Sequence, residues 1–152
     1  MRHGIDTDFL LAVEIREHPF HEPAHALFEK LLSAGDSLAL APQVLAEFAH
    51  VATDQRRFPK PLSMPRALER AKWWWEASEV EQVFPGANSV ALALEWMEEH
   101  SLGRKRILDT HLAAMLRMNE VSSLVTNNQS DFRVFECFEL LDFRSEENTT
   151  FK

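Results

Sequence analysis

Four carboxylate side chains stand at positions where a hydrolytic metal site would need them. Two come in the segments that follow predicted strands and two lie on apolar faces of predicted helices; in that order they are Asp6, Asp131, Glu47 and Asp109. Carboxylate oxygens are the hard ligands that Mg2+ and Mn2+ prefer. A water molecule on such an ion loses its proton more easily and can attack a phosphorus atom while the ion neutralises the developing charge. If the four side chains converge, the sequence predicts phosphodiester hydrolysis.

Each of these carboxylates also has a purely structural explanation. Asp6 or its neighbour Asp8 can cap the helix that follows, and Asp131 can be an ordinary turn residue. Glu47 shares a helix face with apolar residues, where a carboxylate is costly unless a cation compensates it, or it reaches solvent from the edge of that face. Asp109 either caps its helix or faces inward. Spacing alone leaves these alternatives open.

The elements that would position these residues alternate between strands and helices. The predicted strands are residues 3–5, 37–40, 79–84, 122–126 and 135–141, and the predicted helices are residues 7–17, 23–33, 42–57, 65–77, 88–100 and 108–119. Strands separated by helices pair in parallel through right-handed crossovers, which predicts an α/β protein with helices on both faces of one sheet, a three-layer α/β/α sandwich. Such sheets bind ligands beyond the carboxyl ends of their strands, which is where Asp6 and Asp131 are expected.

Length and composition indicate one domain. The chain has 152 residues, 45% of them apolar, which suits a single core spanning residues 1–143 and a loose polar tail over residues 144–152. A single cysteine, Cys137, excludes an internal disulfide framework and fits a reducing compartment. No stretch approaches the length of a membrane span. We therefore expect a cytoplasmic protein with no membrane segment.

The charge of the chain favours catalysis over passive binding of nucleic acid. Its 24 acidic and 16 basic residues give a net charge of −8, whereas nucleic-acid binders usually offer positive potential to phosphates. An enzyme that collects carboxylates for a metal ion is compatible with this excess. Arg104, Lys105 and Arg106 immediately precede the helix of Asp109; they can hold substrate phosphates or form an ordinary solvated loop.

A second motif, His21-Glu22-Pro23-Ala24-His25, matches the H-E-x-x-H pattern of zinc proteases. Proline is comfortable only in the first turn of a helix, so we expect His21 to lie at or before the helix start and not one regular turn below His25. The sequence therefore favours His18, His21 and His25 as solvent-facing residues and disfavours a zinc site.

Four segments stand in an order and spacing typical of one family: Gly4-Ile5-Asp6-Thr7, Leu45-Ala46-Glu47-Phe48, Ile107-Leu108-Asp109-Thr110-His111-Leu112-Ala113-Ala114, and Leu124-Val125-Thr126-Asn127-Asn128 with Asp131-Phe132. Over residues 3–143 the chain resembles the PIN-domain ribonucleases, and in particular the VapC toxins of toxin–antitoxin pairs. The resemblance implies a parallel five-stranded sheet between helices. It also implies that Asp6, Glu47 and Asp109 are the principal metal-binding acids and Asp131 a fourth, more variable one. Thr126 matches a small hydroxyl residue near the site, and Asn128 stands where some members carry another Asp, which leaves the choice between one and two ions open.

The same resemblance implies function and partners. It predicts a Mg2+- or Mn2+-dependent ribonuclease, a small antitoxin that blocks the site, often with a basic side chain, and a homodimer. In the run Trp73-Trp74-Trp75 at least one ring must be exposed or meet a partner, because three consecutive helical residues cannot share one face. The alternative is a catalytically silent PIN-like domain for RNA binding or regulation. Retention of all four acids argues against it.

Overall fold

The strands of the sheet are short, and all of them pair in parallel. The computed structural model describes residues 1–144, and its five-stranded sheet has the order β3–β2–β1–β4–β5. The strands are β1 (Arg2–Ile5), β2 (Ser37–Leu40), β3 (Val80–Gln82), β4 (Ser123–Val125) and β5 (Glu139–Leu141). In the central strand, Gly4 lies opposite Ala39 of β2 and Leu124 of β4. The central strands are almost entirely buried, as expected for a parallel sheet covered on both faces.

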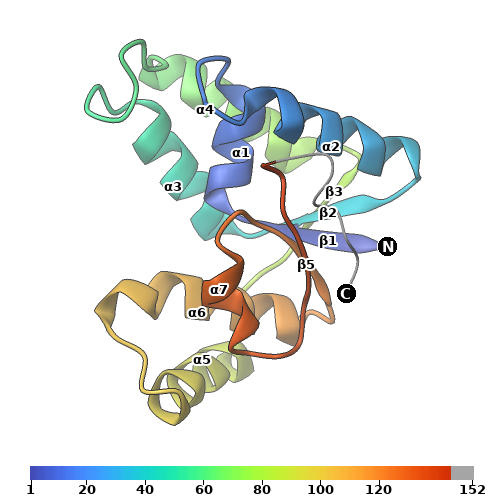
Figure 1. Cartoon of the computed structure of the whole chain (residues 1–152), viewed down its shortest axis with the longest axis vertical. Coiled ribbons are helices and arrows are strands. Elements are labelled where there is room, and N and C mark those ends of the chain that lie inside the picture. The colour runs from blue at the N-terminus through green and yellow to red at the C-terminus, as the bar shows by residue number, and fades with distance from the viewer. Residues whose placement is uncertain (145–152) are drawn as a thin grey trace.

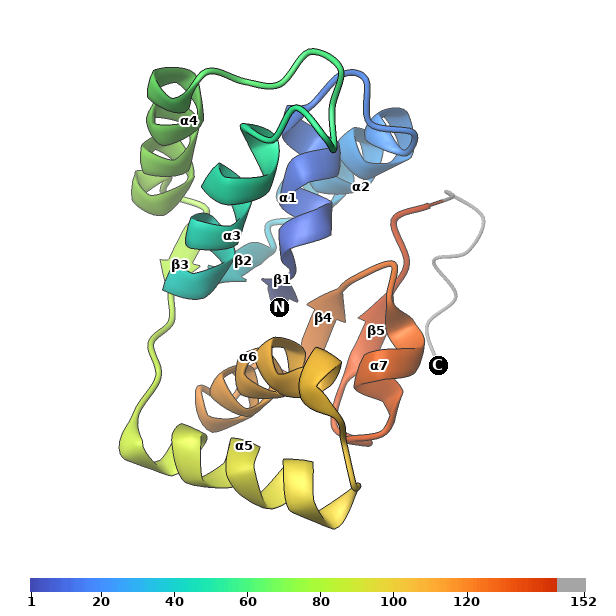
Figure 2. The same ribbon diagram turned by 90° about the vertical axis from the view of Figure 1, so that its left-hand side faces the viewer.

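Helices cover the two faces of the sheet (Figures 1 and 2). One layer contains α1 (Thr7–Glu14), α2 (His21–Ser33), α3 (Pro42–Ala52) and α4 (Met64–Glu76). The other contains α5 (Ala87–Glu99), the 3-10 turn η1 (Arg104–Arg106), α6 (Ile107–Met118) and α7 (Gln129–Arg133). The predicted α/β sandwich with a parallel five-stranded sheet is confirmed. No helix in residues 1–144 combines the length and the hydropathy needed to span a membrane.

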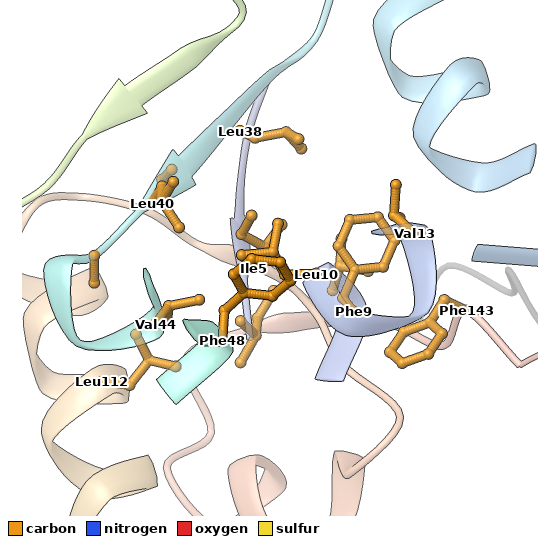
Figure 3. Close-up of a cluster of buried hydrophobic side chains, with 14 of the residues drawn as sticks. Ile5, Phe9, Leu10, Val13, Leu38, Leu40, Val44, Phe48, Leu112 and Phe143 are labelled. Atoms are coloured by element: carbon orange, nitrogen blue, oxygen red, sulfur yellow. The ribbon is translucent and has the colours of Figure 1, made fainter. Parts of the chain in front are cut away.

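The core between the sheet and the first helical layer is aromatic and aliphatic. Phe9 and Leu10 of α1 and Phe48 of α3 pack around Ile5 of β1, and all four are fully buried (Figure 3). The ring of Phe9 also lies 5.4 Å from that of Phe143. Burial of each such side chain contributes about 1.5–3 kcal/mol. This packing fixes the start of α1, and with it the residue between β1 and α1.

On the opposite face, β1 and α6 approach closely. A Cβ atom on Gly4 would lie 2.6 Å from Leu116 Cδ1, so a larger residue here would force the Leu116 side chain to shift. The close approach brings the start of α6 toward the carboxyl end of β1.

The chain order creates a crevice between β1 and β4. From β1 the chain continues through α1 and α2 to β2 on one side, whereas from β4 it continues through α7 to β5 on the other. Ile5, the last residue of β1, pairs with Val125, the last residue of β4. Helices that leave adjacent strands toward opposite faces leave a crevice at the carboxyl ends, where α/β proteins bind ligands.

Several predicted boundaries were wrong. Helix α1 ends at Glu14 and not at residue 17, because Ile15 adopts an extended backbone and is buried. Asp131, for which a turn position was one explanation, lies instead within α7. The strand predicted over residues 135–141 is limited to β5, since Glu136 adopts a left-handed backbone conformation with φ 52°. The predicted tail lies outside the described residues except for Arg144.

Candidate active site

A cavity of about 530 Å3 opens at the carboxyl ends of β1 and β4. Asp6 after β1, Glu47 on α3 and Asp109 on α6 all line it. The cavity also has an apolar lining that includes the buried side chains of Leu11 and Leu112. Three of the four predicted carboxylates, separated by up to about a hundred residues in the chain, are therefore brought together in one cavity.

Asp6 both caps α1 and faces the cavity. Its Oδ1 accepts a hydrogen bond from the Phe9 backbone N–H at 2.9 Å, and its Oδ2 accepts one from the Thr126 hydroxyl at 2.5 Å. The side chain is 8% exposed, and burial raises its pKa from 3.8 to about 7. The two hydrogen bonds oppose this rise, whereas the charges of Asp8 and Asp109 add to it. The capping explanation and the site explanation thus hold for the same carboxylate.

Glu47 is partly buried and held toward the cavity. It follows the buried Val44 by one helical turn, and its Oε2 accepts a hydrogen bond from the Thr7 hydroxyl at 2.9 Å. Since Thr7 directly follows Asp6, this bond ties the Glu47 carboxylate to the start of α1 at the cavity wall. Glu47 is therefore directed into the cavity and keeps partial exposure there.

Asp109 lies in the first turn of α6 and faces inward. Burial, together with the negative charges of Asp131 and Glu47, raises its pKa to about 6, although Arg106 opposes the rise. A hydrogen bond of 3.1 Å from Gln43 Nε2 to the Leu108 carbonyl joins α3 to α6 beside it. This bond keeps the two helices that carry Glu47 and Asp109 together.

Asp131 does not line the cavity. It lies on α7, where its Oδ2 accepts a hydrogen bond from Asn128 Nδ2 at 2.5 Å and its Oδ1 is 3.5 Å from Arg106 Nη1. Arg106 also donates to the Asp131 backbone carbonyl. Asn128 lines the cavity, and its backbone N–H donates to the Thr126 hydroxyl oxygen at 3.0 Å. Asp131 is therefore engaged by a cation and an amide, in contrast to the other three acids.

The carboxylates in the cavity match the donor chemistry of a divalent cation. The raised pKa values of Asp6 and Asp109 show that burial and mutual repulsion disfavour their charged forms, which a bound cation would stabilise. Within residues 1–144, no three His, Cys, Asp or Glu side chains are close enough together to enclose an ion by themselves. Mg2+ commonly keeps several water ligands and binds through one or two carboxylates. The residues present thus fit Mg2+ or Mn2+ held partly through water.

Residues 5–135 match the family model of the PIN domain. The chain belongs to the PIN-domain family. This PIN domain is 26% identical over 143 residues to Ribonuclease VapC48 of Mycobacterium tuberculosis, an alignment that covers 93% of this chain and 97% of the relative. The resemblance predicted from the sequence is confirmed.

Solved structures share the fold of this PIN domain. It is similar to the M. tuberculosis toxin VapC20, described as a Sarcin-Ricin loop cleaving toxin, with a TM-score of 0.61, 19% identity, and coverage of 82% of this chain and 87% of the other. It is also similar to a chain of a toxin–antitoxin complex from Klebsiella pneumoniae, with a TM-score of 0.58, 15% identity, and coverage of 86% and 89%.

Sequence reasoning missed a set of polar residues at the rim of the PIN-domain cavity. Asp8 Oδ1 lies 3.1 Å from His18 Nε2, and its Oδ2 accepts a hydrogen bond from Asn127 Nδ2 at 2.5 Å. Burial is the largest single effect on the pKa of Asp8 and raises it. The contacts with His18 and Asn127 and the charge of Arg57 together outweigh burial, so the pKa lies below its ordinary value. The spacing of Asp8, two residues after Asp6, was the available signal; nothing in the sequence marked Arg57.

Two predictions about the histidines were wrong. His18 and His21 are not solvent-facing: His18 contacts Asp8, and His21 Nδ1 lies 2.8 Å from the Ala12 carbonyl, to which it donates. Helix α2 begins at His21, so Pro23 lies in its first turn and the rings of His21 and His25 are one turn apart, 5.8 Å between centroids. No third ligand joins them in the part of the chain that the structure describes, so the zinc interpretation gains no support.

The basic segment divides into two parts. Arg106 is partly buried and bound to Asp131, whereas Arg104 and Lys105 are exposed on η1. A phosphate-binding role for Arg104 and Lys105 stays a prediction. For Arg106 the structure shows a contact to α7 instead of a solvated loop.

Proposed function

We propose that this PIN domain is a Mg2+- or Mn2+-dependent ribonuclease that hydrolyses RNA phosphodiester bonds and acts as the toxin of a toxin–antitoxin pair. The observation that carries the proposal is the convergence of Asp6, Glu47 and Asp109 on one cavity at the carboxyl ends of β1 and β4. The likeness to Ribonuclease VapC48 over nearly the whole chain supports the choice of RNA as substrate.

The chain's own residues prepare the site. The Phe9 N–H and the Thr126 hydroxyl hold both oxygens of Asp6, and Thr7 orients Glu47, so two carboxylates have fixed directions before substrate binds. Asp6, Glu47 and Asp109 would hold the cation, which supplies neutralisation of phosphate charge and a more acidic water molecule. With pKa values of about 7 and about 6, Asp6 and Asp109 release protons near neutral pH as a cation binds.

We assign Asp131 a positioning role and a single ion to the site. The Asp131 carboxylate is already bound by Arg106 and by the Asn128 side chain. The backbone N–H of Asn128 in turn donates to the Thr126 hydroxyl. Asp131 thus supports the Thr126 hydroxyl that holds Asp6. A second ion would have to displace Arg106 from Asp131.

Cleavage assays with purified variants test this proposal. Wild-type protein is incubated with a mixture of transfer and ribosomal RNA in Mg2+, in Mn2+ and in EDTA. Asp6→Asn, Glu47→Gln and Asp109→Asn should each lower the cleavage rate by at least about a hundredfold, because charge stabilisation at such a site amounts to several kcal/mol. Asp54→Asn, in the turn after α3 and outside the cavity, is the matched control and should cleave normally.

Two results would contradict the proposal. Cleavage that persists in EDTA would exclude metal dependence. Binding of RNA without cleavage in any metal would favour the catalytically silent PIN-like domain.

We also propose a small antitoxin partner that covers α4. Met64, Leu68 and Trp73 of α4 are each about half exposed, and Trp73 also lines a second cavity of about 450 Å3 between α1, α2 and α4. Trp74 is buried and donates to Glu14 at 2.6 Å, so the partner-facing ring of the tryptophan run is Trp73. An exposed aromatic ring at the edge of a cavity is typical of a protein interface.

Coexpression tests the partner. The product of a short reading frame next to the gene should copurify with this chain and inhibit cleavage, and Trp73→Ala should weaken that association. A neighbouring product that neither binds nor inhibits would contradict the toxin role without affecting the nuclease. The homodimer and the cytoplasmic location stay predictions.

A further inference from the structure

Among the described residues that line the active-site cavity, Arg57 is the one basic side chain. It faces a cavity with four carboxylates: Asp6, Asp8, Glu47 and Asp109. Its influence on the pKa of Asp8 shows that the guanidinium lies near this acidic wall. The Arg57 side chain is exposed, and within residues 1–144 it forms no hydrogen bond or ion pair. Its N–H donors are therefore available at the mouth of the cavity.

The backbone around Arg57 is fixed although its side chain is free. The backbone N–H groups of Arg57 and Phe58 both donate to the Asp54 carbonyl at 3.1 Å. Phe58 is buried, and its ring lies 6.5 Å from that of His18, which is itself bound to Asp8. The turn after α3 is thus anchored to the core on the side that faces the cavity.

The adjacent Arg56 has a different environment. Its Nε lies 3.2 Å from Asp54 Oδ1, its side chain is 88% exposed, and it does not line the cavity. Two consecutive arginines in one turn therefore differ in placement and in partners: Arg57 lines the cavity, whereas Arg56 faces away and is paired with Asp54. Arg56 provides a control of identical chemistry.

A polyanionic substrate needs a positive group at this rim. The carboxylates repel RNA phosphates wherever a cation does not shield them. A guanidinium presents a planar set of N–H donors that matches two phosphate oxygens at once. Since Arg57 is not committed to any of the nearby acids, it can make this contact without breaking an existing one.

We propose that Arg57 binds a backbone phosphate of the RNA strand next to the scissile phosphodiester and so sets the strand across the carboxylates from the α3–α4 side. This inference rests on the proposed function, because it concerns how that substrate is held. It adds to the nuclease a substrate-binding residue that lies on a different element from each of the three acids.

Binding and kinetics together test the inference. Fluorescence anisotropy of a short, labelled single-stranded RNA of randomised sequence is measured over a salt series, with Ca2+ in place of Mg2+ and with intact RNA verified on a gel. Arg57→Ala should bind at least about tenfold more weakly, as expected for loss of a charged hydrogen bond. The slope of log K against log salt should become shallower by about 0.7, the value for one phosphate contact on a single strand.

Three further measurements sharpen the result. Arg57→Lys should keep the salt slope but bind with intermediate affinity, because lysine retains the charge and loses the planar pair of donors. Arg56→Ala should match wild type in both affinity and slope. In Mg2+, Arg57→Ala should raise KM far more than it lowers kcat, whereas a general loss of structure would lower both stability and kcat.

The outcomes separate the inference from the function on which it rests. Wild-type RNA binding and cleavage with an unchanged affinity and slope in Arg57→Ala would overturn the inference alone. Equal losses in Arg56→Ala and Arg57→Ala would also overturn it, since they would indicate nonspecific charge. Wild-type protein that neither binds nor cleaves RNA would reject the proposed function and this inference together.

Discussion

We expect Asp6→Asn to make the metal-free protein more stable above neutral pH and slightly less stable in acid. The reason is the raised pKa of Asp6, which burial moves from 3.8 to about 7. The folded protein therefore binds this proton more tightly than the unfolded chain does. Between these two pH values the stability of the wild type falls as pH rises, because the folded state must ionise a buried carboxylate.

The size of the effect follows from the contacts of Asp6. A pKa raised from 3.8 to about 7 corresponds to about 4 kcal/mol, since each tenfold change in proton affinity is about 1.4 kcal/mol. An asparagine amide never ionises and so avoids this penalty. It cannot accept from both the Phe9 N–H and the Thr126 hydroxyl, however, so one hydrogen bond of about 1 kcal/mol is lost. The net change is a gain of about 3 kcal/mol in alkali and a loss of about 1 kcal/mol in acid.

Urea denaturation in EDTA measures this difference directly. The free energy of unfolding of wild type and Asp6→Asn is compared at about pH 8 and about pH 3, on either side of the window in which the wild-type stability should fall. Asp54→Asn is the control, because the backbone and side-chain hydrogen bonds from Arg56 lower the pKa of Asp54. It should show no gain at high pH. A difference between wild type and Asp6→Asn that does not change with pH would refute the reasoning.

Three other changes have defined expected outcomes. Thr126→Val removes the hydroxyl that donates to Asp6, so the pKa of Asp6 should rise above about 7 and the free energy of unfolding fall by about 1–3 kcal/mol, measured by NMR titration and denaturation of the metal-free protein. Gly4→Ala should cost about 1–3 kcal/mol by overpacking against Leu116, and Leu116→Ala in the same chain should show a favourable coupling in a double-mutant cycle; simple additivity would disprove the contact. His25→Ala should leave RNA cleavage unchanged, and the wild-type protein should contain no stoichiometric zinc. Loss of activity in His25→Ala would revive the zinc interpretation.

The sequence was sufficient for features that depend on local pattern. The position of Asp6 between a strand and a helix follows from periods of two and 3.6 residues that neighbouring side chains reveal, whereas the inward direction of Glu47 and Asp109 was one of two alternatives that the pattern left open. The lengths of the connections between strands indicated parallel pairing and hence the α/β class. The structure confirms the predicted fold class.

Local boundaries within that pattern were less accessible. Whether His21 and His25 share a helical turn depends on where α2 begins, and a proline is accommodated anywhere in the first turn. Residues 129–133 contain turn-forming side chains, yet they form α7 because Phe132 is buried in the core and Arg106 holds the Asp131 carbonyl. Tertiary contacts decided both cases.

Only the tertiary structure decided how the acids differ from one another. The strand order places β4 beside β1, so that Thr126 reaches Asp6 across 120 residues of chain while Asp131 turns toward Arg106. The same arrangement brings Arg57 to the mouth of the cavity. The sequence could name carboxylates as candidates because side-chain chemistry is local. Their burial, pKa values and partners could not be predicted, because these depend on distances between segments that only the folded sheet brings together.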